Sequence, residues 1–197
     1  MTQLLIAINL LVTLMLPLQV FAGGPLDTVQ GHVNQELDVL RDPNLKAESA
    51  KETKERKIES IADALFDYAA LSRFTLGRNW RKLNSDQRTE FVQLFRQILQ
   101  KTYMDTILSY SDEKVVFDRE VMLSEDKAEV QSKIITSSKE IPIFYRAYLK
   151  SGQWKVYDII VEGVSLVKNY RTQFNEILAK QSPDELLKIM RQKVGKA

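Results

Sequence analysis

The sequence predicts an α+β protein in which helices wrap a curved antiparallel sheet. Up to about residue 111, hydrophobic residues recur every three or four positions, which is the period of an amphipathic helix. From Lys114 they alternate with polar residues, as in strands, and from Val164 the helical period returns. Short connections between strand segments require antiparallel neighbours. We therefore expect one sheet of about four main strands with helices packed on it.

The first two expected helices carry many charges. Asp27 or Thr28 can cap the first helix, because their side-chain oxygens accept backbone hydrogen bonds, and Asp42-Pro43-Asn44 ends it. The second helix covers Lys46–Leu65, and basic and acidic residues alternate in its first half. This charge run indicates a solvated helical face rather than a docking surface.

The next two expected helices supply the longest apolar stripe of the chain. Asp67 can cap a short helix over Tyr68–Leu76, and Gly77 can end it, because glycine adopts the left-handed conformation that often follows a helix. Asn84 or Ser85 then begins the longest helix. The residues of its apolar stripe are Phe91, Leu94, Phe95, Ile98, Leu99, Tyr103 and Ile107. A stripe this wide is typical of ordinary core or of one wall of a ligand pocket.

Five strand segments follow the long helix. They cover Val115–Asp118, Glu120–Leu123, Ala128–Ser137, Ile141–Lys150 and Trp154–Val161. Alternation in the fourth segment places one set of side chains on a single face of the sheet. That set is Ile141, Ile143, Tyr145, Ala147 and Leu149. Turn residues between the last three segments predict hairpins, and hence a meander.

Two helices are expected after the sheet. The first spans Val164–Gln181, and Ser182-Pro183-Asp184-Glu185 supplies a capping box and a first-turn proline for the second. We therefore predict a mainly helical part over residues 23–111 and a sheet with C-terminal helices over residues 112–197. The two parts are expected to share one core and one ligand pocket.

The N-terminus predicts a secretory signal peptide over residues 1–22. Leu4–Leu16 is almost wholly apolar but too short to span a bilayer, and small side chains near Ala22 suit a signal peptidase. The alternative is an N-terminal membrane anchor. With the signal removed, the protein is expected in the periplasm of a Gram-negative cell.

The composition argues against several classes of function. The 197 residues include no cysteine and a single histidine, His32, so a zinc site or a histidine-based catalytic triad lacks suitable side chains. We expect no metal, no cofactor and no catalytic residue. The net charge of +2 comes from interspersed charges. Nucleic-acid-binding proteins usually show a clustered basic face instead.

Two signatures in the sequence suggest a family. The first is Leu76-Gly77-Arg78, followed by Trp80 and by the aromatic residues spaced along the long helix. The second consists of Trp154, Val156, Asp158, Glu162, Gly163, Val164, Ser165, Tyr170 and Phe174. In order and spacing, from about Asp67 to Met190, these residues resemble the MlaC, or toluene-tolerance, family of periplasmic phospholipid-binding proteins. Asn79 stands where that family has an aromatic residue.

The resemblance implies a cone of the NTF2-like type with an added helical subdomain. It also implies a soluble monomer that carries one phospholipid as cargo. Its partners would be an inner-membrane complex of an MCE protein with an ABC transporter, and an outer-membrane complex of a lipoprotein with a porin. Each methylene exposed to water costs about 0.8 kcal/mol, so such a carrier needs a dry apolar pocket.

The expected pocket has two walls, with the long helix facing the concave sheet and the acyl chains between them. Under this hypothesis the lining residues are Phe91, Leu94, Phe95, Ile98, Leu99 and Tyr103 on the helix, and Ile143, Tyr145, Ala147, Leu149 and Val156 on the sheet. Arg78 and Arg146 are candidates for the pocket mouth or for contact with acidic partners. Ordinary surface ion pairs are the alternative for both arginines.

Two other functions remain open on the sequence alone. A periplasmic chaperone or adaptor can use the same groove to bind protein. A cone-shaped enzyme can use Asp158 as a base, with Tyr145 or Tyr157 as a donor, on an apolar substrate. The competing interpretation makes Asp158 a strand-end residue that caps nearby amides. An enzyme requires Asp158 inside the pocket, whereas a carrier requires a pocket without converging acids.

Overall fold

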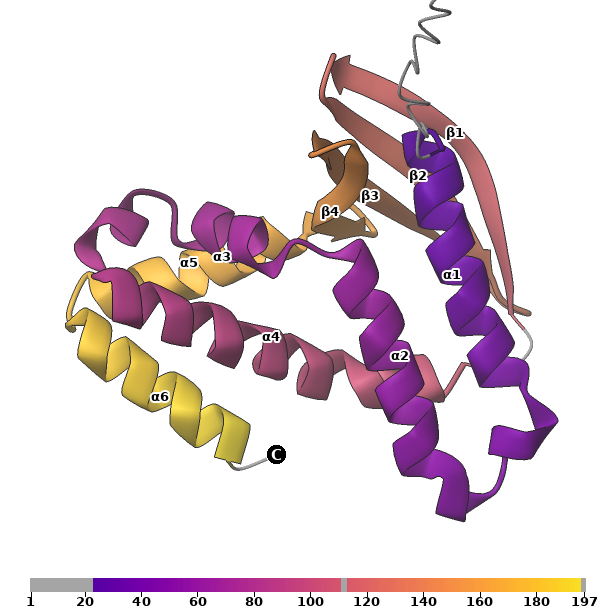
Figure 1. The fold of residues 1–197 in the computed structure, drawn as a ribbon, viewed down its shortest axis with the longest axis horizontal. Helices are drawn as coiled ribbons and strands as arrows, with labels where there is room; N and C mark the ends of the chain where they lie inside the picture. Colours follow the sequence, from indigo (N-terminus) through magenta and orange to yellow (C-terminus); the bar gives the residue numbers. More distant parts are fainter. Residues whose placement is uncertain (1–22, 111–112, 196–197) are drawn as a thin grey trace, which may run out of the picture.

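The computed structural model describes residues 23–110 and 113–195, so the predicted signal peptide lies outside the described residues. Figure 1 shows one curved sheet and its helices, which confirms the α+β class. The helices are α1 (Pro25–Arg41), α2 (Lys51–Leu65), α3 (Tyr68–Leu76), α4 (Ser85–Leu108), α5 (Leu166–Leu178) and α6 (Pro183–Gly195). Short 3-10 helices are η1 (Pro43–Leu45), η2 (Glu48–Ala50) and η3 (Gly77–Lys82). The strands are β1 (Lys114–Ser124), β2 (Lys127–Ile135), β3 (Glu140–Lys150), β4 (Gln153–Val161) and β5 (Val164–Ser165).

The sheet is an antiparallel meander in the order β1-β2-β3-β4-β5. Four strands are long and β5 has two residues, in agreement with the predicted four main strands. Strand β1 is continuous, whereas the sequence predicted two segments there. The pairing register shifts between Phe117 and Arg119. Such a bulge interrupts the alternation of side chains, which explains the apparent boundary.

The predicted ends of α3 and the predicted start of α4 rest on local hydrogen bonds, whereas α1 begins at Pro25 after Gly24 without a side-chain cap, so the predicted cap at Asp27 or Thr28 was wrong. Asp67 caps α3, since its carboxylate accepts a hydrogen bond from the backbone N–H of Ala70 at 2.9 Å. Gly77 ends α3 with a φ of +54°, a conformation that favours glycine. Asn84 and Gln87 form a capping box at the start of α4. These contacts involve neighbours in the chain, which is why the sequence could predict them.

The buried apolar side chains form two clusters. The helical core joins α3, α4, α5 and α6 and consists of Leu71, Leu76, Leu83, Phe91, Leu94, Phe95, Ile98, Leu99, Val167, Tyr170, Phe174, Leu178, Leu186, Leu187 and Met190. The sheet core joins α1, the end of α2 and the sheet, and consists of Val29, Val33, Leu37, Leu65, Ala128, Val130, Tyr145, Ala147, Trp154 and Val156. Phe66 packs against both cores.

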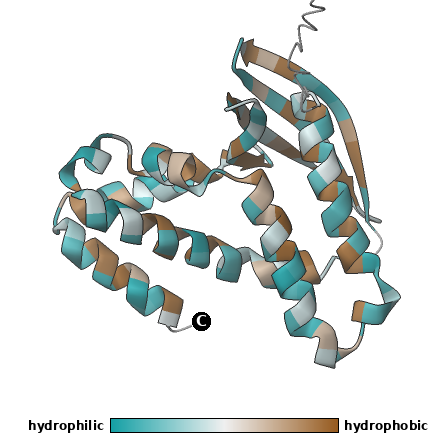
Figure 2. Ribbon diagram, viewed as in Figure 1, coloured by the Kyte–Doolittle hydropathy of each residue, from teal (hydrophilic) through white to brown (hydrophobic). Residues whose placement is uncertain are grey.

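The structure corrects the expectation of a single shared core. Helices α3 to α6 lie together at one end of the molecule, whereas α1 and the sheet lie at the other (Figure 1). The apolar residues of each helix, brown in Figure 2, alternate with polar residues as an amphipathic helix requires. Helical periodicity shows which face of a helix is buried but leaves open which element covers it. This is why α5 and α6 were expected to cover the sheet.

Candidate functional site

The two predicted walls of the pocket do not face each other. Phe91, Leu94, Phe95, Ile98 and Leu99 belong to the helical core, and Tyr103 is 38 % exposed. The ring centroids of Phe95 and Tyr170 lie 4.9 Å apart, and those of Phe91 and Phe174 lie 5.3 Å apart. The apolar stripe of α4 therefore packs on α5. The prediction that this stripe faces the concave sheet was wrong.

The predicted sheet residues lie together on one face. Tyr145, Ala147 and Val156 are buried in the sheet core, and Ile143 packs at its edge. Alternation along β3 places Leu149 on the same face, where its side chain is 40 % exposed. The structure thus gathers the sheet half of the predicted pocket and covers it with α1 rather than with α4.

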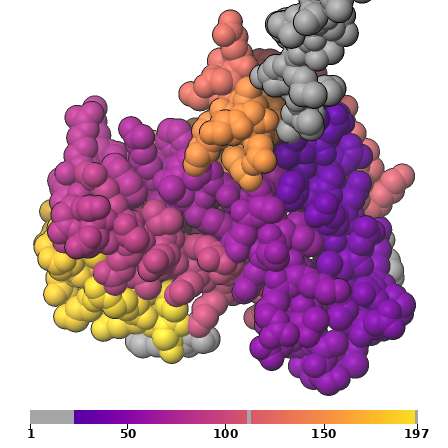
Figure 3. All heavy atoms as spheres, viewed as in Figure 1, coloured from indigo at the N-terminus to yellow at the C-terminus, as the bar shows by residue number. Residues whose placement is uncertain are grey.

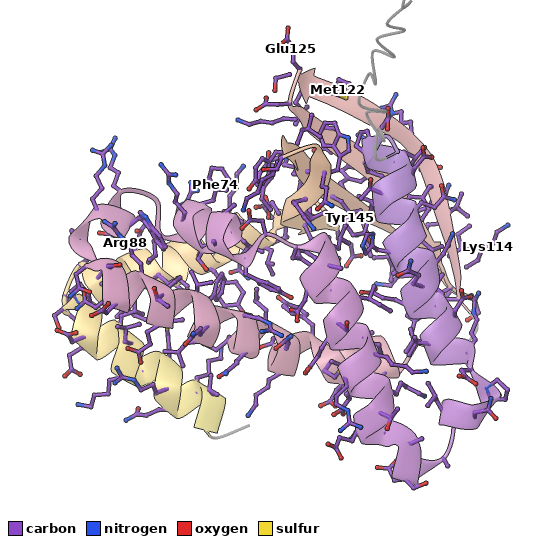
Figure 4. All side chains as sticks on the ribbon, in the orientation of Figure 1. Phe74, Arg88, Lys114, Met122, Glu125 and Tyr145 are labelled. Atoms are coloured by element: carbon purple, nitrogen blue, oxygen red, sulfur yellow. The ribbon has the colours of Figure 1, made fainter. Side chains whose placement is uncertain are left out.

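Several apolar side chains around the sheet core are only partly buried. We call them the sheet-core rim: Leu26, Phe66, Tyr110, Val115, Phe117, Ile143 and Ile159. A closely packed interior surrounds large apolar side chains on all sides, so a rim of partly exposed ones can accept further apolar contacts. The sheet core and its rim together form the candidate lipid-binding surface. Figure 4 shows Tyr145 between the sheet and helices α1 and α2.

Two clefts lie near these cores. One of about 200 Å³ lies between the start of α2 and the end of α4, and charged side chains dominate its lining. The other, of about 310 Å³, lies at the break between α2 and α3. Its lining residues are Asp63, Phe66, Asp67, Tyr68, Lys150, Ser151, Gln153 and Lys155. Charged and polar residues make up most of each lining, so neither cleft is the dry apolar pocket that the sequence predicted.

Asp67 ties the larger cleft to the sheet. Its carboxylate accepts hydrogen bonds from the Lys150 ammonium at 2.5 Å and from the Tyr148 hydroxyl, and its N–H donates to the Val156 carbonyl at 3.0 Å. Burial alone would raise the pKa of Asp67, but the hydrogen bonds from Lys150, Tyr148 and Ala70 outweigh it and lower that pKa. The carboxylate therefore stays charged and links the start of α3 to β3, while the backbone N–H links it to β4.

Glu36 places a carboxyl group beside the sheet core. Among the described residues, the structure gives its side chain no hydrogen bond and no ion pair, and burial raises its pKa to about 7. Burial, together with the nearby Glu36 charge, also raises the pKa of Tyr145. The sequence patterns did not single out Glu36 as a site residue. Its position three residues after Val33, on the apolar face of the first helix, could have indicated that this acid is buried.

The structure supports the capping interpretation of Asp158. Its carboxylate accepts hydrogen bonds from the Ser165 hydroxyl at 2.6 Å and from the Val167 N–H at 3.0 Å. Asp158 pairs with Arg146 across the sheet, while Tyr145 pairs with Ile159. Adjacent pairs point to opposite faces, so Asp158 and Tyr145 do not converge. Tyr157, the chain neighbour of Asp158, packs instead on Phe74, with 5.0 Å between ring centroids.

The two arginines predicted at the pocket mouth have different surroundings. Arg146 forms an ion pair with Glu129, with 3.1 Å between Nε and Oε2. Arg78 is exposed, and its side chain has no partner among the residues that the structure describes. Over the same residues, no group of three or more metal-ligating side chains is found, and no helix is both long and apolar enough to cross a membrane.

Comparison with known proteins gives consistent matches. The model of the MlaC protein family matches residues 30–192. The chain is 30% identical over 122 residues to the intermembrane phospholipid transport system binding protein MlaC of Haemophilus influenzae, covering 59% of this chain and 57% of that protein. It is 24% identical over 169 residues to toluene tolerance protein ttg2D of Pseudomonas putida, covering 85% and 79%. The chain thus spans little more than half the length of the first relative.

A solved structure supports the fold. The phospholipid-binding protein of Ralstonia solanacearum, solved in complex with a phospholipid, superposes with a TM-score of 0.78 at 20% identity. The match covers 88% of this chain and 98% of that one. At this identity the likeness shows the shared fold. Since the family model covers most of the sequence, the chain belongs to the MlaC family.

Proposed function

We propose that this protein carries a phospholipid through the periplasm, with the acyl chains on the sheet core and its rim. Membership of the MlaC family is the observation that carries the proposal. Its relative in H. influenzae is named as a binding protein of an intermembrane phospholipid transport system, and the similar R. solanacearum protein binds a phospholipid. The predicted signal peptide supports the periplasmic location.

The sheet core is the better candidate for the acyl chains than the stripe of α4. The α4 side chains already contact aromatic rings of α5, so a lipid there would have to displace packed core. The sheet face is covered by α1, and apolar side chains remain partly exposed around it. We therefore assign the partly exposed Ile143 and Leu149 to the lipid site, with Tyr145, Ala147 and Val156 forming the buried layer beneath them, and assign the α4 residues a supporting role.

The partners under this proposal are the two membrane complexes of the pathway. One contains an MCE protein with an ABC transporter in the inner membrane, and the other contains a lipoprotein with a porin in the outer membrane. The name of the H. influenzae relative supports the intermembrane system as a whole. A carrier needs to release its cargo to the next partner, which favours apolar contacts over tight recognition of the head group.

Matched variants of two isoleucines test the lipid site. Ile143 lies at the edge of the sheet core and Ile177 at the edge of the helical core, and both are partly buried. A carboxylate at position 143 would have to lose its hydration against acyl chains. We expect Ile143→Glu to reduce phospholipid occupancy at least tenfold, as measured by native mass spectrometry, and Ile177→Glu to leave it near the wild-type level.

Three outcomes separate the alternatives. Normal occupancy in Ile143→Glu would exclude the sheet face as the site, and loss of lipid in Ile177→Glu would restore the helical stripe as a candidate. Wild-type protein that neither carries phospholipid nor takes it from vesicles would overturn the carrier function. If such protein bound unfolded polypeptide instead, the chaperone alternative would replace it.

A further inference from the structure

One stretch of the chain carries a single sign of charge. Residues 68–83 contain four basic residues and no acidic residue. These four are Arg73, Arg78, Arg81 and Lys82, and all are exposed on α3 and η3. Figure 3 shows this segment in magenta on the outer surface at one end of the molecule. We call it the basic segment.

The charges of the basic segment are not neutralised within the protein. The ion pairs that the structure forms over residues 23–110 and 113–195 use cations elsewhere, such as Arg96 with Asp63 and Arg191 with Glu90. Arg171 on α5 adds another positive charge next to this segment. Its Nε–H donates to the Phe74 carbonyl at 2.9 Å, which holds the guanidinium there. The segment is therefore a positive patch on a chain whose net charge is only +2.

An aromatic ring lies within the same segment. Phe74 is 39 % exposed and packs one side of its ring on Tyr157. Figure 4 shows Phe74 on the side of α3 that is turned away from α4. A partly exposed aromatic side chain in a segment whose charged residues are all basic matches the composition of surfaces that rest at the polar–apolar boundary of a bilayer.

We propose that the basic segment, with Phe74, docks the protein on the surface of an anionic phospholipid bilayer. None of its basic residues lines either of the two clefts described above. Exposed cations that form no ion pair with the described residues fit the diffuse negative charge of anionic head groups, where each Lys or Arg strengthens binding roughly fivefold. This inference goes beyond the proposed function, since it concerns the surface of the protein and not its cargo.

The test compares two double variants with the same net charge. Arg78→Glu/Arg81→Glu removes charge from the basic segment, and Lys51→Glu/Lys57→Glu removes the same charge from α2. Each variant changes the net charge of the full chain from +2 to −2. Co-sedimentation is measured with vesicles of phosphatidylcholine alone or mixed with phosphatidylglycerol, using protein already loaded with phospholipid.

We expect the wild-type protein to co-sediment with the anionic vesicles, and this binding to fall as NaCl is added because salt screens exposed charges. Arg78→Glu/Arg81→Glu should weaken it by about 25-fold or more, and the α2 variant should weaken it far less. Absence of wild-type binding to anionic vesicles, or equal losses in the two variants, would overturn the proposal. Native mass spectrometry of the same samples reports lipid occupancy, so failure of this inference is distinguishable from failure of the carrier function.

Discussion

Among single side chains, Glu36 is a carboxyl group whose charge should change near neutral pH. Its pKa rises from the ordinary value of 4.5 to about 7 because burial disfavours the charged form. Between these two values the folded protein binds more protons than the unfolded chain, so stability should decrease as pH rises from about 4.5 to about 7. Above about pH 7 no further stability is lost, and the total decrease in the free energy of unfolding is at most roughly 3 kcal/mol.

Glu36→Gln should remove this pH dependence. At pH 8 we expect the variant to be more stable than the wild type by up to roughly 3 kcal/mol, and near pH 4 we expect equal stabilities. Urea unfolding at the two pH values measures the difference. Asp38→Asn serves as the control, because Asp38 is an exposed acid on the same helix. Equal gains in stability from Glu36→Gln and from Asp38→Asn would show that Glu36 is not the cause.

Asp158 is expected to be a structural residue. Asp158→Ala leaves the Ser165 hydroxyl and the Val167 N–H without their acceptor in a buried place, which should cost about 3 kcal/mol of unfolding free energy. Thermal unfolding measures this loss. At a temperature where the variant is still folded, phospholipid occupancy should stay at the wild-type level. Unchanged stability together with a loss of function would favour a chemical role for this carboxylate.

Secondary-structure elements depend on their ends as well as on their packing. The capping box of α4 joins Asn84 and Gln87, with hydrogen bonds of 2.9 and 3.0 Å between side chain and backbone. Asn84→Ala should lower the free energy of unfolding by about 1 kcal/mol, since it leaves a first-turn N–H without its partner. Asn84→Asp keeps an acceptor and should retain most of the stability in urea unfolding. Equal losses in the two variants would contradict a capping role.

Over the whole molecule, Phe66 connects the helical core to the sheet core. The two tryptophans report on these cores separately, because Trp80 packs against the helical core and Trp154 belongs to the sheet core. With Trp80→Phe or Trp154→Phe as background, we expect the remaining tryptophan to give the same urea midpoint in either case. This is the behaviour of one cooperative unit.

Phe66→Ala should separate the two midpoints. Removal of the ring deletes contacts to both cores and leaves them joined by the pairing of Phe66 with Val156, by the hydrogen bonds of Asp67 with β3 and β4, and by the packing of Phe74 on Tyr157. Fluorescence of each single-tryptophan protein measures the midpoints. Met122→Ala is the control, because Met122 belongs to neither core and its side chain is 49 % exposed on β1, and it should leave the midpoints coincident. Midpoints that stay together in Phe66→Ala would show that other contacts couple the cores.

The elements of the fold could be predicted because each depends on residues that are close in the chain. The caps at Asp67 and Asn84, the glycine after α3 and the alternation along β3 all involve neighbours within a few positions. The resemblance to the MlaC family added the prediction that the ligand is a phospholipid. A capping role for Asp158 could also be predicted, because its partner Ser165 lies only seven residues away in the chain.

Tertiary structure decided which apolar faces meet. The stripe of α4 suits the sheet and α5 equally well, because hydrophobic burial has no direction and rewards any apolar surface removed from water. Only the fold shows that Phe95 packs on Tyr170 and Phe174, while Tyr145 and Ala147 lie under α1. The basic segment can be read in the sequence, but only the fold shows that its cations form no ion pairs with the described residues. Whether a charge is paired depends on contacts between residues far apart in sequence, and periodicity carries no information about those contacts.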